Sequence, residues 1–309
     1  ILQLQCENNK KGIVKAVKQF RQLDGFAMTT SVFCMEYTGI YNNHLLEYLL
    51  SCKSHIWLET ALQIKQSQGM KRGKTDSVDA TRIAEYAFIH KHKMRLWSPP
   101  RKEIKRLRTL ITMRDRLVNS LKELKTPLKE SAGFVDKDIA KMEAFLMKTS
   151  ISSLKRTIEK IEKEMQELVK KDPPLKQLFD LMTSIPGVGA IVAVNMIVVT
   201  DEFKKFDDPN KFACYAGVVP FDHRSGSSIR GKSKVSHLAN KKIKTLFHLA
   251  ALSAITVKGE IQEYYLRKVA EGKNKMSVIN AIRNKLIHRI FAVIKRLTPY
   301  QKNIIAGLA

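Results

Sequence analysis

The chain has 309 residues, of which 44% are hydrophobic, and its 55 Lys and Arg outnumber its 29 Asp and Glu, for a formal net charge of +26. This length and apolar content predict a folded protein of about two domains and exclude a disordered tail. The charge favours a polyanionic partner. No apolar run approaches the roughly 20 residues that span a bilayer, and no signal-peptide pattern opens the chain. Nucleic acid, rather than a membrane, is therefore the expected partner.

Residues 1–98 alternate between helical and extended patterns, which is typical of an α/β sheet domain. Short apolar runs predict strands at 30–36 and 55–58, and a basic loop is expected at 69–74. Helices are predicted at 8–20, 42–50 and 76–90. Pro99-Pro100 ends the alternation and marks a domain boundary.

The segment at 99–174 predicts two long helices. Residues 101–130 are helical in pattern and strongly basic. A heptad seam follows, formed by Ile151, Leu154, Ile158, Ile161, Met165 and Leu168. This seam can close an antiparallel hairpin within the chain or meet a partner chain, and both alternatives fit the pattern. Asp172-Pro173-Pro174 ends the segment.

Residues 175–309 predict a second domain that is mostly helical. Its helices are expected at 175–184, 190–200, 211–217, 240–258, 260–271 and 276–296. The stretch from Phe221 to Lys234 is polar, Gly-rich and basic, and it is predicted to be a loop. The expected fold class is therefore α/β followed by mostly α.

Three carboxylates are unusual in so basic a chain. Glu36 ends a predicted strand, where open α/β sheets bind ligands, and Asp76 and Asp79 share one face of a predicted helix. Crowded carboxylates cost free energy unless a cation compensates them, and oxygen donors suit Mg²⁺. We therefore predict a metal site that acts on phosphodiesters. The alternative for Asp76 is that it only stabilises the helix dipole and caps free amides.

A glycine-rich turn, Ser184-Ile185-Pro186-Gly187-Val188-Gly189-Ala190, lies between two predicted helices. Its two glycines allow backbone amides to face a phosphate at a helix N-terminus, as in a helix-hairpin-helix motif. The alternative is an ordinary glycine turn between helices.

The predicted basic loop carries candidate contacts to a nucleic-acid backbone, namely Arg224, Arg230, Lys232 and Lys234. Ser225 lies among them and could act as a nucleophile if a base or a bound phosphate lay beside it. Spacing alone favours the alternative, a solvated loop serine.

These motifs occur in one order, and by them the chain closely resembles the insertion-sequence-110/1111-type DEDD transposases, a family that includes the Piv-like DNA invertases. The matching segments are Glu36–Tyr41, Lys71–Ala80, Ile185–Gly189, Cys214–Pro220, Ser225-Gly226 and Asn240–Lys244. They run over nearly the whole chain. The Lys-x-Asp-x-x-Asp-Ala block, together with the Tyr-Ala-Gly-x-x-Pro block and a later Ser-Gly, is quite specific.

The resemblance implies a RuvC-like domain of RNase H fold at 1–98, a coiled-coil hairpin at 99–174 and a C-terminal transposase domain with a serine loop at 175–309. It implies that Mg²⁺ ligands from an Asp-Glu-Asp-Asp tetrad map to Glu36, Asp76 and Asp79. It also implies that Ser225 attacks DNA and forms a covalent link, and that a structured RNA encoded by the element chooses the DNA sites.

One residue of the tetrad is missing, because no suitable Asp precedes Glu36 and Asp24 looks like part of a turn. We therefore expect the RuvC-like domain to lack its first strand or strands. Ser227 and Ser228 lie close to Ser225, so the nucleophile is assigned on the Ser-Gly match alone.

The sequence thus predicts a bacterial, cytoplasmic, nucleoid-associated transposase or site-specific recombinase. The heptad seam and the need to cut two strands favour a dimer or tetramer. A decayed scaffold that binds nucleic acid without cutting it is the alternative. A nuclease that uses metal alone, without joining strands, is a third possibility.

Overall fold

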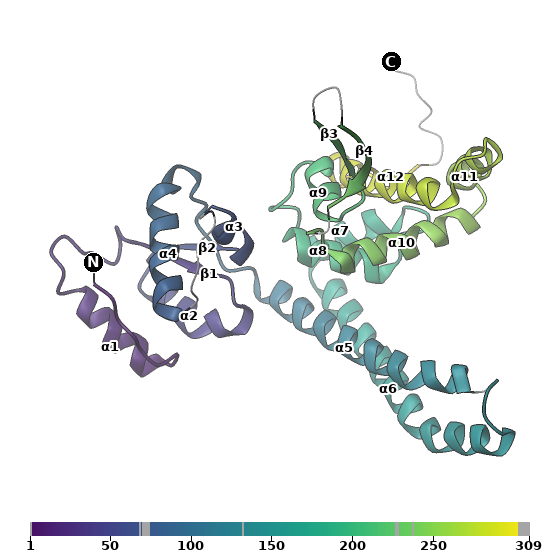
Figure 1. The fold of residues 1–309 in the computed structure, drawn as a ribbon, viewed down its shortest axis with the longest axis horizontal. Helices are drawn as coiled ribbons and strands as arrows, with labels where there is room; N and C mark the ends of the chain where they lie inside the picture. Colours follow the sequence, from purple (N-terminus) through teal and green to yellow (C-terminus); the bar gives the residue numbers. More distant parts are fainter. Residues whose placement is uncertain are drawn as a thin grey trace. The chain divides into compact units, whose positions relative to one another are not determined.

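The computed structural model describes residues 2–67, 69, 75–131, 133–225, 229–236 and 238–301, with only the backbone described at 222–225, 229–230 and 232–234. The chain divides into two compact units, residues 1–99 and 100–309 (Figure 1). The basic loop predicted at 69–74 lies outside the described residues except for Gly69. In the described part of the chain, no helix is both long and apolar enough to cross a bilayer.

The first unit is a small α/β unit. Its elements are α1 (Lys10–Phe20), β1 (Val32–Glu36), η1 (Gly39–Asn42), α2 (Asn43–Ser51), β2 (His55–Glu59), α3 (Ala61–Gln66), α4 (Asp76–Ile89) and η2 (Lys91–Lys93). The predicted strands and helices of this region are confirmed. The two strands pair in parallel, with Val32 opposite His55 and Glu36 opposite Glu59. This sheet agrees with the α/β class, while the RNase H arrangement stays a prediction.

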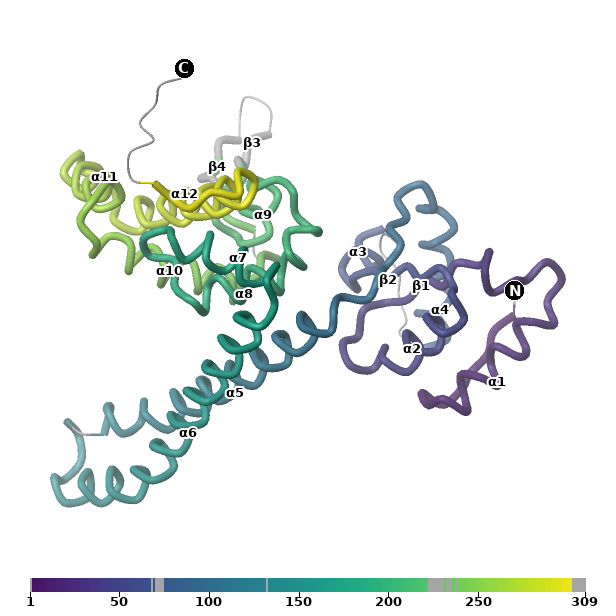
Figure 2. The backbone as a smooth tube through the Cα atoms, turned by 180° about the vertical axis from the view of Figure 1, so that it is seen from behind, coloured from purple at the N-terminus to yellow at the C-terminus, as the bar shows by residue number. Residues whose placement is uncertain are grey.

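Helices cover both faces of this two-stranded sheet. On one face, Leu46 and Leu49 of α2 pack against Met35 and Ile56 of the strands. On the other, Tyr86 of α4 packs with Trp57, Ile64 and their neighbours, and α4 lies alongside the strands in both views (Figures 1 and 2). This alternation follows from the strand period of two, which sends successive side chains to opposite faces.

The second unit is mostly helical. Its elements are α5 (Lys102–Ser131), α6 (Lys137–Lys171), α7 (Pro173–Thr183), α8 (Ala190–Thr200), α9 (Pro209–Tyr215), β3 (Pro220–Ser225), β4 (Ile229–Val235), α10 (Lys241–Thr256), α11 (Glu260–Ala270) and α12 (Lys275–Arg296). Every helix predicted for this part of the sequence is present. The ends of α5 and of α7–α12 differ from the predicted ones by a few residues at most, as is usual where helices fray, whereas α6 begins 14 residues before the predicted seam.

The two longest helices, α5 and α6, pack side by side. Arg106 pairs with Glu164 at 3.3 Å and Arg114 pairs with Glu162 at 2.6 Å, and near the far end Ser131 donates to Glu143 at 2.9 Å. Because residue numbers rise along α5 as they fall along α6, the helices run antiparallel.

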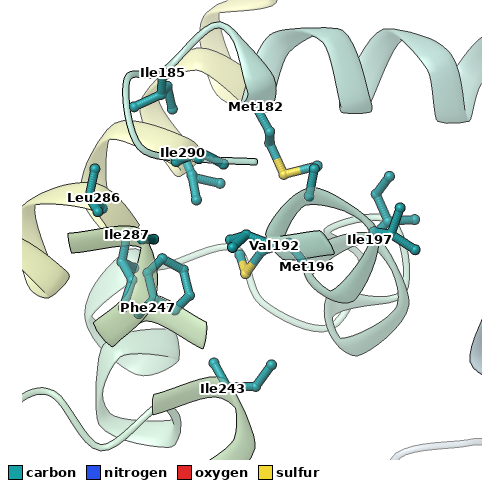
Figure 3. Close-up of a cluster of buried hydrophobic side chains, with 14 of the residues drawn as sticks. Met182, Ile185, Val192, Met196, Ile197, Ile243, Phe247, Leu286, Ile287 and Ile290 are labelled. Carbon is teal, nitrogen blue, oxygen red and sulfur yellow. The ribbon is translucent and has the colours of Figure 1, made fainter. Parts of the chain in front are cut away.

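One continuous core joins the first turns of α5 to the remaining helices of this unit. Ile104 and Leu107 are completely buried and belong to the same cluster as Met182, Phe247 and Ile290. Figure 3 shows side chains of α7, α8, α10 and α12 meeting in this core. Burial of large apolar side chains is the main stabilising term here, at roughly 1.5–3 kcal/mol for each fully buried side chain.

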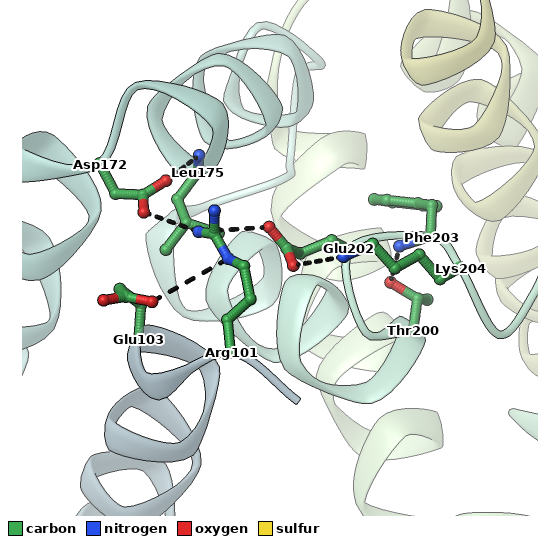
Figure 4. Close-up of polar contacts among 8 residues, drawn as sticks. All are labelled: Arg101, Glu103, Asp172, Leu175, Thr200, Glu202, Phe203 and Lys204. Atoms are coloured by element: carbon green, nitrogen blue, oxygen red, sulfur yellow. Dashed lines mark hydrogen bonds and ion pairs between the residues drawn. The ribbon is translucent and has the colours of Figure 1, made fainter. Parts of the chain in front are cut away.

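Arg101 joins three segments at the start of α5 (Figure 4). Its guanidinium pairs with Asp172 at 2.6 Å and with Glu202 at 3.4 Å, while Asp172 accepts from the amide of Leu175 at 3.0 Å and so caps α7. Glu202 lies in a run of three left-handed residues, with φ of 52° at Asp201, 58° at Glu202 and 64° at Phe203. Such conformations are costly without glycine, and the ion pair helps to hold this one.

The prediction that Phe221–Lys234 is a loop is wrong. The structure has an antiparallel hairpin there, in which β3 and β4 pair from Pro220 opposite Val235 to Ser225 opposite Ile229, with an irregular register between Phe221 and His223. The sequence concealed these strands because Asp, Gly, Ser and Lys have low strand propensity. The backbone pairs regardless, and the Gly-Ser-Ser stretch at 226–228 lies outside the described residues.

In the glycine turn between α7 and α8, the first glycine, Gly187, packs closely against α10. Gly187 has a φ of +88°, and a Cβ there would lie 2.6 Å from the Cβ of Ala254 and 2.7 Å from the carbonyl oxygen of Ala250. At Gly189, which precedes α8, a Cβ would meet no atom within 4 Å. Gly187 therefore lets α10 approach the turn closely.

We predict that Gly187→Ala lowers the free energy of unfolding by roughly 2–4 kcal/mol, through overpacking and a disfavoured φ. The matched control Gly189→Ala should cost about 1 kcal/mol or less, because its φ is −88° and its surroundings are open. Denaturant unfolding of both variants measures the difference. Equal losses would contradict the packing role of Gly187.

Candidate active site

Glu36 occupies the carboxyl end of β1, as predicted, and its neighbour across the sheet is another acid. Its backbone partner in the parallel register is Glu59, the last residue of β2. Residues directly opposite one another extend to the same face of a sheet. The structure thus pairs Glu36 with a carboxylate that the sequence interpretation did not include.

The two oxygens of Glu59 are both occupied. Oε1 accepts from the backbone amide of Thr60 at 2.8 Å, and Oε2 accepts from the hydroxyl of Tyr86 at 3.2 Å. Burial, followed by the charge of Glu59, raises the pKa of Tyr86 to about 12 and that of Cys34 to about 11. The Tyr86 hydroxyl therefore stays protonated and donates to Glu59, which ties α4 to the end of β2.

Asp76 and Asp79 lie in the first turn of α4, as predicted. Thr75 is the N-cap and accepts from the amide of Val78 at 3.3 Å, so Asp76 is not the capping residue. Asp76 is exposed, while Asp79 pairs with Arg82 at 3.1 Å. Asp79 precedes Tyr86 by seven residues, which places both on the same face of the helix.

The donor types of these residues suit a hard divalent cation, since all three are carboxylates. The geometry is less complete: among the residues that the structure describes, no three Asp, Glu, His or Cys side chains gather closely enough to hold one ion. Arg82 already compensates the charge of Asp79. The described geometry alone therefore does not define a metal site, and metal binding by these carboxylates stays a prediction.

Ser225 is the last residue of β3, and its backbone pairs with that of Ile229 across the hairpin. Arg224 and Arg230 are register partners one position further from the turn. The side chains of Ser225, Arg224, Arg230, Lys232 and Lys234 lie outside the described part of the structure. Their predicted contacts with nucleic acid, and those of Gly187 and Gly189, stay predictions.

The base of the hairpin is braced on both sides by asparagines. Asn240, which follows β4, donates through its backbone amide to the Tyr215 carbonyl at 2.8 Å and through its side chain to the Tyr215 hydroxyl at 2.7 Å. Asn280 of α12 donates to the carbonyl oxygen of Val218, just before β3, at 2.7 Å. The Tyr-Ala-Gly-x-x-Pro segment is thus the anchor of the serine-bearing hairpin.

A buried arginine of α12 contacts Asn280, one of the two asparagines at the base of the hairpin. Arg283 of α12 is only 6% exposed, and it donates to Asn280 at 3.3 Å and to Nδ1 of His248 at 2.5 Å. Because a guanidinium can only donate, His248 must present a lone pair at Nδ1. Burial, and then the charge of Arg283, lower the pKa of His248 below its usual value.

The sequence interpretation missed Glu59, Tyr86, Asn280 and the pair of His248 with Arg283. Glu59 was detectable, because the second predicted strand, like the first, is followed by an acid. The others were not, since each depends on a contact between helices or strands far apart in the sequence.

Two models of transposase families match the chain, one at its N-terminal part and one within the second unit. A model of DEDD transposases of the IS110 type matches residues 1–131, and the model described as "Transposase IS116/IS110/IS902 family" matches residues 180–266. The pilin gene-inverting protein of Moraxella lacunata is 26% identical over 301 residues, which cover 96% of this chain and 90% of that protein. The protein of the same name from Moraxella bovis is 25% identical over the same length and coverage.

A third relative comes from an insertion element. The uncharacterised 43.6 kDa protein of insertion element IS110 from Streptomyces coelicolor is 26% identical over 160 residues, or 52% of this chain and 38% of that protein. These similarities define the class of the chain as a DNA transposase or recombinase. The chain carries transposase domains of the IS110/IS116 family at residues 1–131 and 180–266.

We predict that His248 makes stability depend on pH. Its folded pKa lies below the 6.5 of the unfolded chain, so unfolding takes up a proton and the free energy of unfolding falls as the pH drops through about 6.5. His248→Gln keeps an acceptor for Arg283 but does not titrate. Denaturant unfolding at pH 7.5 and 5.5 should therefore show a smaller loss in this variant. An equal loss in both proteins would contradict the assignment.

Proposed function

We propose that this transposase cuts and joins DNA through Ser225, assisted by a divalent metal held by Glu36, Asp76 and Asp79. The observation that carries the proposal is the combination of an acid-ended parallel strand in the DEDD-matched unit with a braced, serine-bearing hairpin in the unit of the second match. In this proposal residues 1–98 are the RuvC-like domain, 99–174 the coiled-coil hairpin and 175–309 the serine domain.

The proposed reaction is a phosphoryl transfer. The Ser225 hydroxyl loses its proton and its Oγ bonds to phosphorus, while the bond from phosphorus to one DNA oxygen breaks and that oxygen leaves as a hydroxyl. The phosphodiester energy is kept in the serine–phosphate link, which a second DNA hydroxyl can then attack. Mg²⁺, when bound, would stabilise charge on the phosphate oxygens. Arg224, Arg230, Lys232 and Lys234 would hold the DNA backbone beside the serine.

We predict that Ser225→Ala abolishes the covalent protein–DNA adduct formed on labelled element-end DNA, because it removes the attacking oxygen. Ser227→Ala and Ser228→Ala are the matched controls and should retain the adduct. Denaturing gel electrophoresis of the labelled DNA measures both products and adduct. Unchanged cleavage by Ser225→Ala would instead support a nuclease that uses metal alone.

A second prediction concerns the metal. Glu36→Gln should weaken Mg²⁺ binding roughly ten-fold or more, since it removes a charged ligand from a site with few others. Glu47→Gln, an exposed acid of α2, is the matched control and should leave binding unchanged. Isothermal titration with Mg²⁺ and Mn²⁺ provides the affinities. Identical affinities for the two variants would remove Glu36 from the proposed site.

The competing proposal is a scaffold that binds nucleic acid but has lost catalysis. It is favoured by one observation, the lack of a three-donor metal group among the described residues. It predicts salt-sensitive binding without adduct or Mg²⁺ dependence in any variant, so the two experiments above distinguish it from the recombinase.

Guidance by a structured RNA and assembly into a dimer or tetramer complete the proposal. Apolar side chains are exposed near the start of α6, including Phe145 at 75%, Leu146 at 62% and Met142 at 55%. Such a stripe on a helix supports contact with another chain.

The excess of Lys and Arg suits an RNA backbone as well as a DNA backbone, and action on DNA would associate the protein with the nucleoid.

A further inference from the structure

The chain leaves Glu36 through a turn that exposes two tyrosines. Tyr37 is 51% exposed and Tyr41, in η1, is 69% exposed. The two rings are four residues apart in the sequence, and both are open to solvent and to a bound partner. Neither belongs to the residues assigned above to metal, serine or phosphate.

The backbone of the turn that carries the tyrosines is held by a buried asparagine. Asn42 is only 7% exposed and its side chain donates to the carbonyl oxygen of Glu36 at 2.9 Å. The same side chain accepts from the amide of Thr38 at 2.6 Å. A turn whose backbone is already ordered loses less conformational entropy on binding than a mobile turn does.

A basic helix adjoins this turn. Asn8, two residues before α1, donates through its side chain to the carbonyl oxygen of Tyr41 at 3.0 Å. The exposed lysines of α1 lie within about 140° of one another around the helix axis, at a rotation of about 100° per residue; they are Lys10, Lys11, Lys15 and Lys18.

The adjacent face of α1 is fixed to the unit. Ile13 and Val17 are 4% and 3% exposed. A Cβ on Gly12 would lie within 3.0 Å of backbone atoms of Glu7, so the preceding segment also packs closely on the helix. The helix therefore keeps its orientation, and Asn8 links the segment before its first turn to Tyr41.

The lysines of this face are not neutralised. Among the described residues, no acid forms an ion pair with any of the four. Two of them, Lys10 and Lys11, lie in the first turn of α1, which contains no acid, and the helix dipole disfavours cations at that end. Because no acid of the described residues offsets these positive charges, the lysine face is suited to bind an anion.

We propose that Tyr37, Tyr41 and the lysine face of α1 form a binding surface for single-stranded nucleic acid beside Glu36. An unstacked base would lie on the Tyr41 ring, with Tyr37 adjoining it, and the strand's phosphates would follow Lys10 and Lys11. A paired base cannot present its face to a side chain without leaving the stack. A second copy of a chain with net charge +26 is disfavoured by repulsion at this lysine-rich face.

This surface deepens the proposed function, since it would hold an opened strand next to the carboxylate end of β1. It does not depend on the chemistry at Ser225. A binding test can therefore succeed or fail separately from the adduct test.

The experiment uses the full chain and two 12-residue pyrimidine oligonucleotides, one DNA and one RNA, each with a single 5-iodouracil that crosslinks to a neighbouring aromatic ring under light. Mass spectrometry of the digested protein should place the crosslink on Tyr41 or Tyr37. A crosslink with DNA, with RNA or with both supports the surface and identifies the strand. Crosslinks only elsewhere would overturn it.

Affinity by fluorescence anisotropy gives a second measurement. Tyr41→Ala should weaken binding roughly ten-fold and Tyr41→Phe should retain it, because stacking needs only the ring. Phe88→Ala is the matched control, since Phe88 is 77% exposed elsewhere in the same unit, beside Lys91. Equal affinities of Tyr41→Ala and Phe88→Ala would overturn the stacking role.

The salt dependence tests the lysines. The double variant Lys10→Gln, Lys11→Gln should reduce the slope of log affinity against log salt by about 1.4, at about 0.7 per phosphate on a single strand. The matched double variant Lys91→Gln, Lys93→Gln should leave the slope unchanged. Equal slopes would overturn the lysine role. Crosslinking at Tyr41 without any serine adduct would retain this surface and reject the proposed recombination chemistry.

Discussion

The parallel pairing of β1 and β2 determines the candidate carboxylate site. It places Glu36 and Glu59 directly opposite one another at the end of the sheet, where neighbouring strands lie only about 4.8 Å apart. Like charges so close repel one another. The structure resolves this by giving Glu59 two donors, Thr60 and Tyr86, one for each oxygen. Within the described part of the chain, no donor bonds to the Glu36 carboxylate, so Glu36 is the acid of the pair that remains for a ligand.

The same contact positions α4. Tyr86 reaches Glu59 while its ring meets Trp57 at 5.3 Å between centroids, so the helix is fixed against the sheet by one polar and one aromatic contact. Asp79 shares the face of Tyr86, and its position therefore depends on this contact. Glu59 and Tyr86 act on the candidate site through the placement of α4, whereas Glu36, Asp76 and Asp79 supply the ligands in the proposed mechanism.

In the second unit, the proposed nucleophile Ser225 is positioned by contacts at the base of its hairpin. Ser225 lies at the far end of a hairpin whose strands have weak intrinsic propensity, and the support is concentrated at the base. Asn240 and Asn280 hold the two flanks there, and behind Asn280 the buried Arg283 is bound to a neutral His248. The second family model matches residues 180–266, which contain this hairpin and its base.

Local patterns predicted most of the elements, and contacts between distant residues explain the failures. The helical periodicity of α6 and the stop at Asp172-Pro173 predicted its end correctly, and the strands ending at Glu36 and Glu59 followed from short apolar runs. The β3–β4 hairpin was missed because its stability comes from pairing and from anchors such as Asn280, 55 residues beyond Ser225. Gly187 was interpreted through its amide, whereas its packing against Ala254 could be seen only in the fold.

The central claim is that Ser225 itself becomes bonded to DNA. The most direct measurement is mass spectrometry of the adduct after nuclease and trypsin digestion, because cleavage after Arg224 and Arg230 releases a short peptide that contains Ser225, Ser227 and Ser228. The mechanism predicts a nucleotide remnant whose fragmentation places it on Ser225. A remnant on either other serine, or cut DNA with an unmodified peptide, would contradict it.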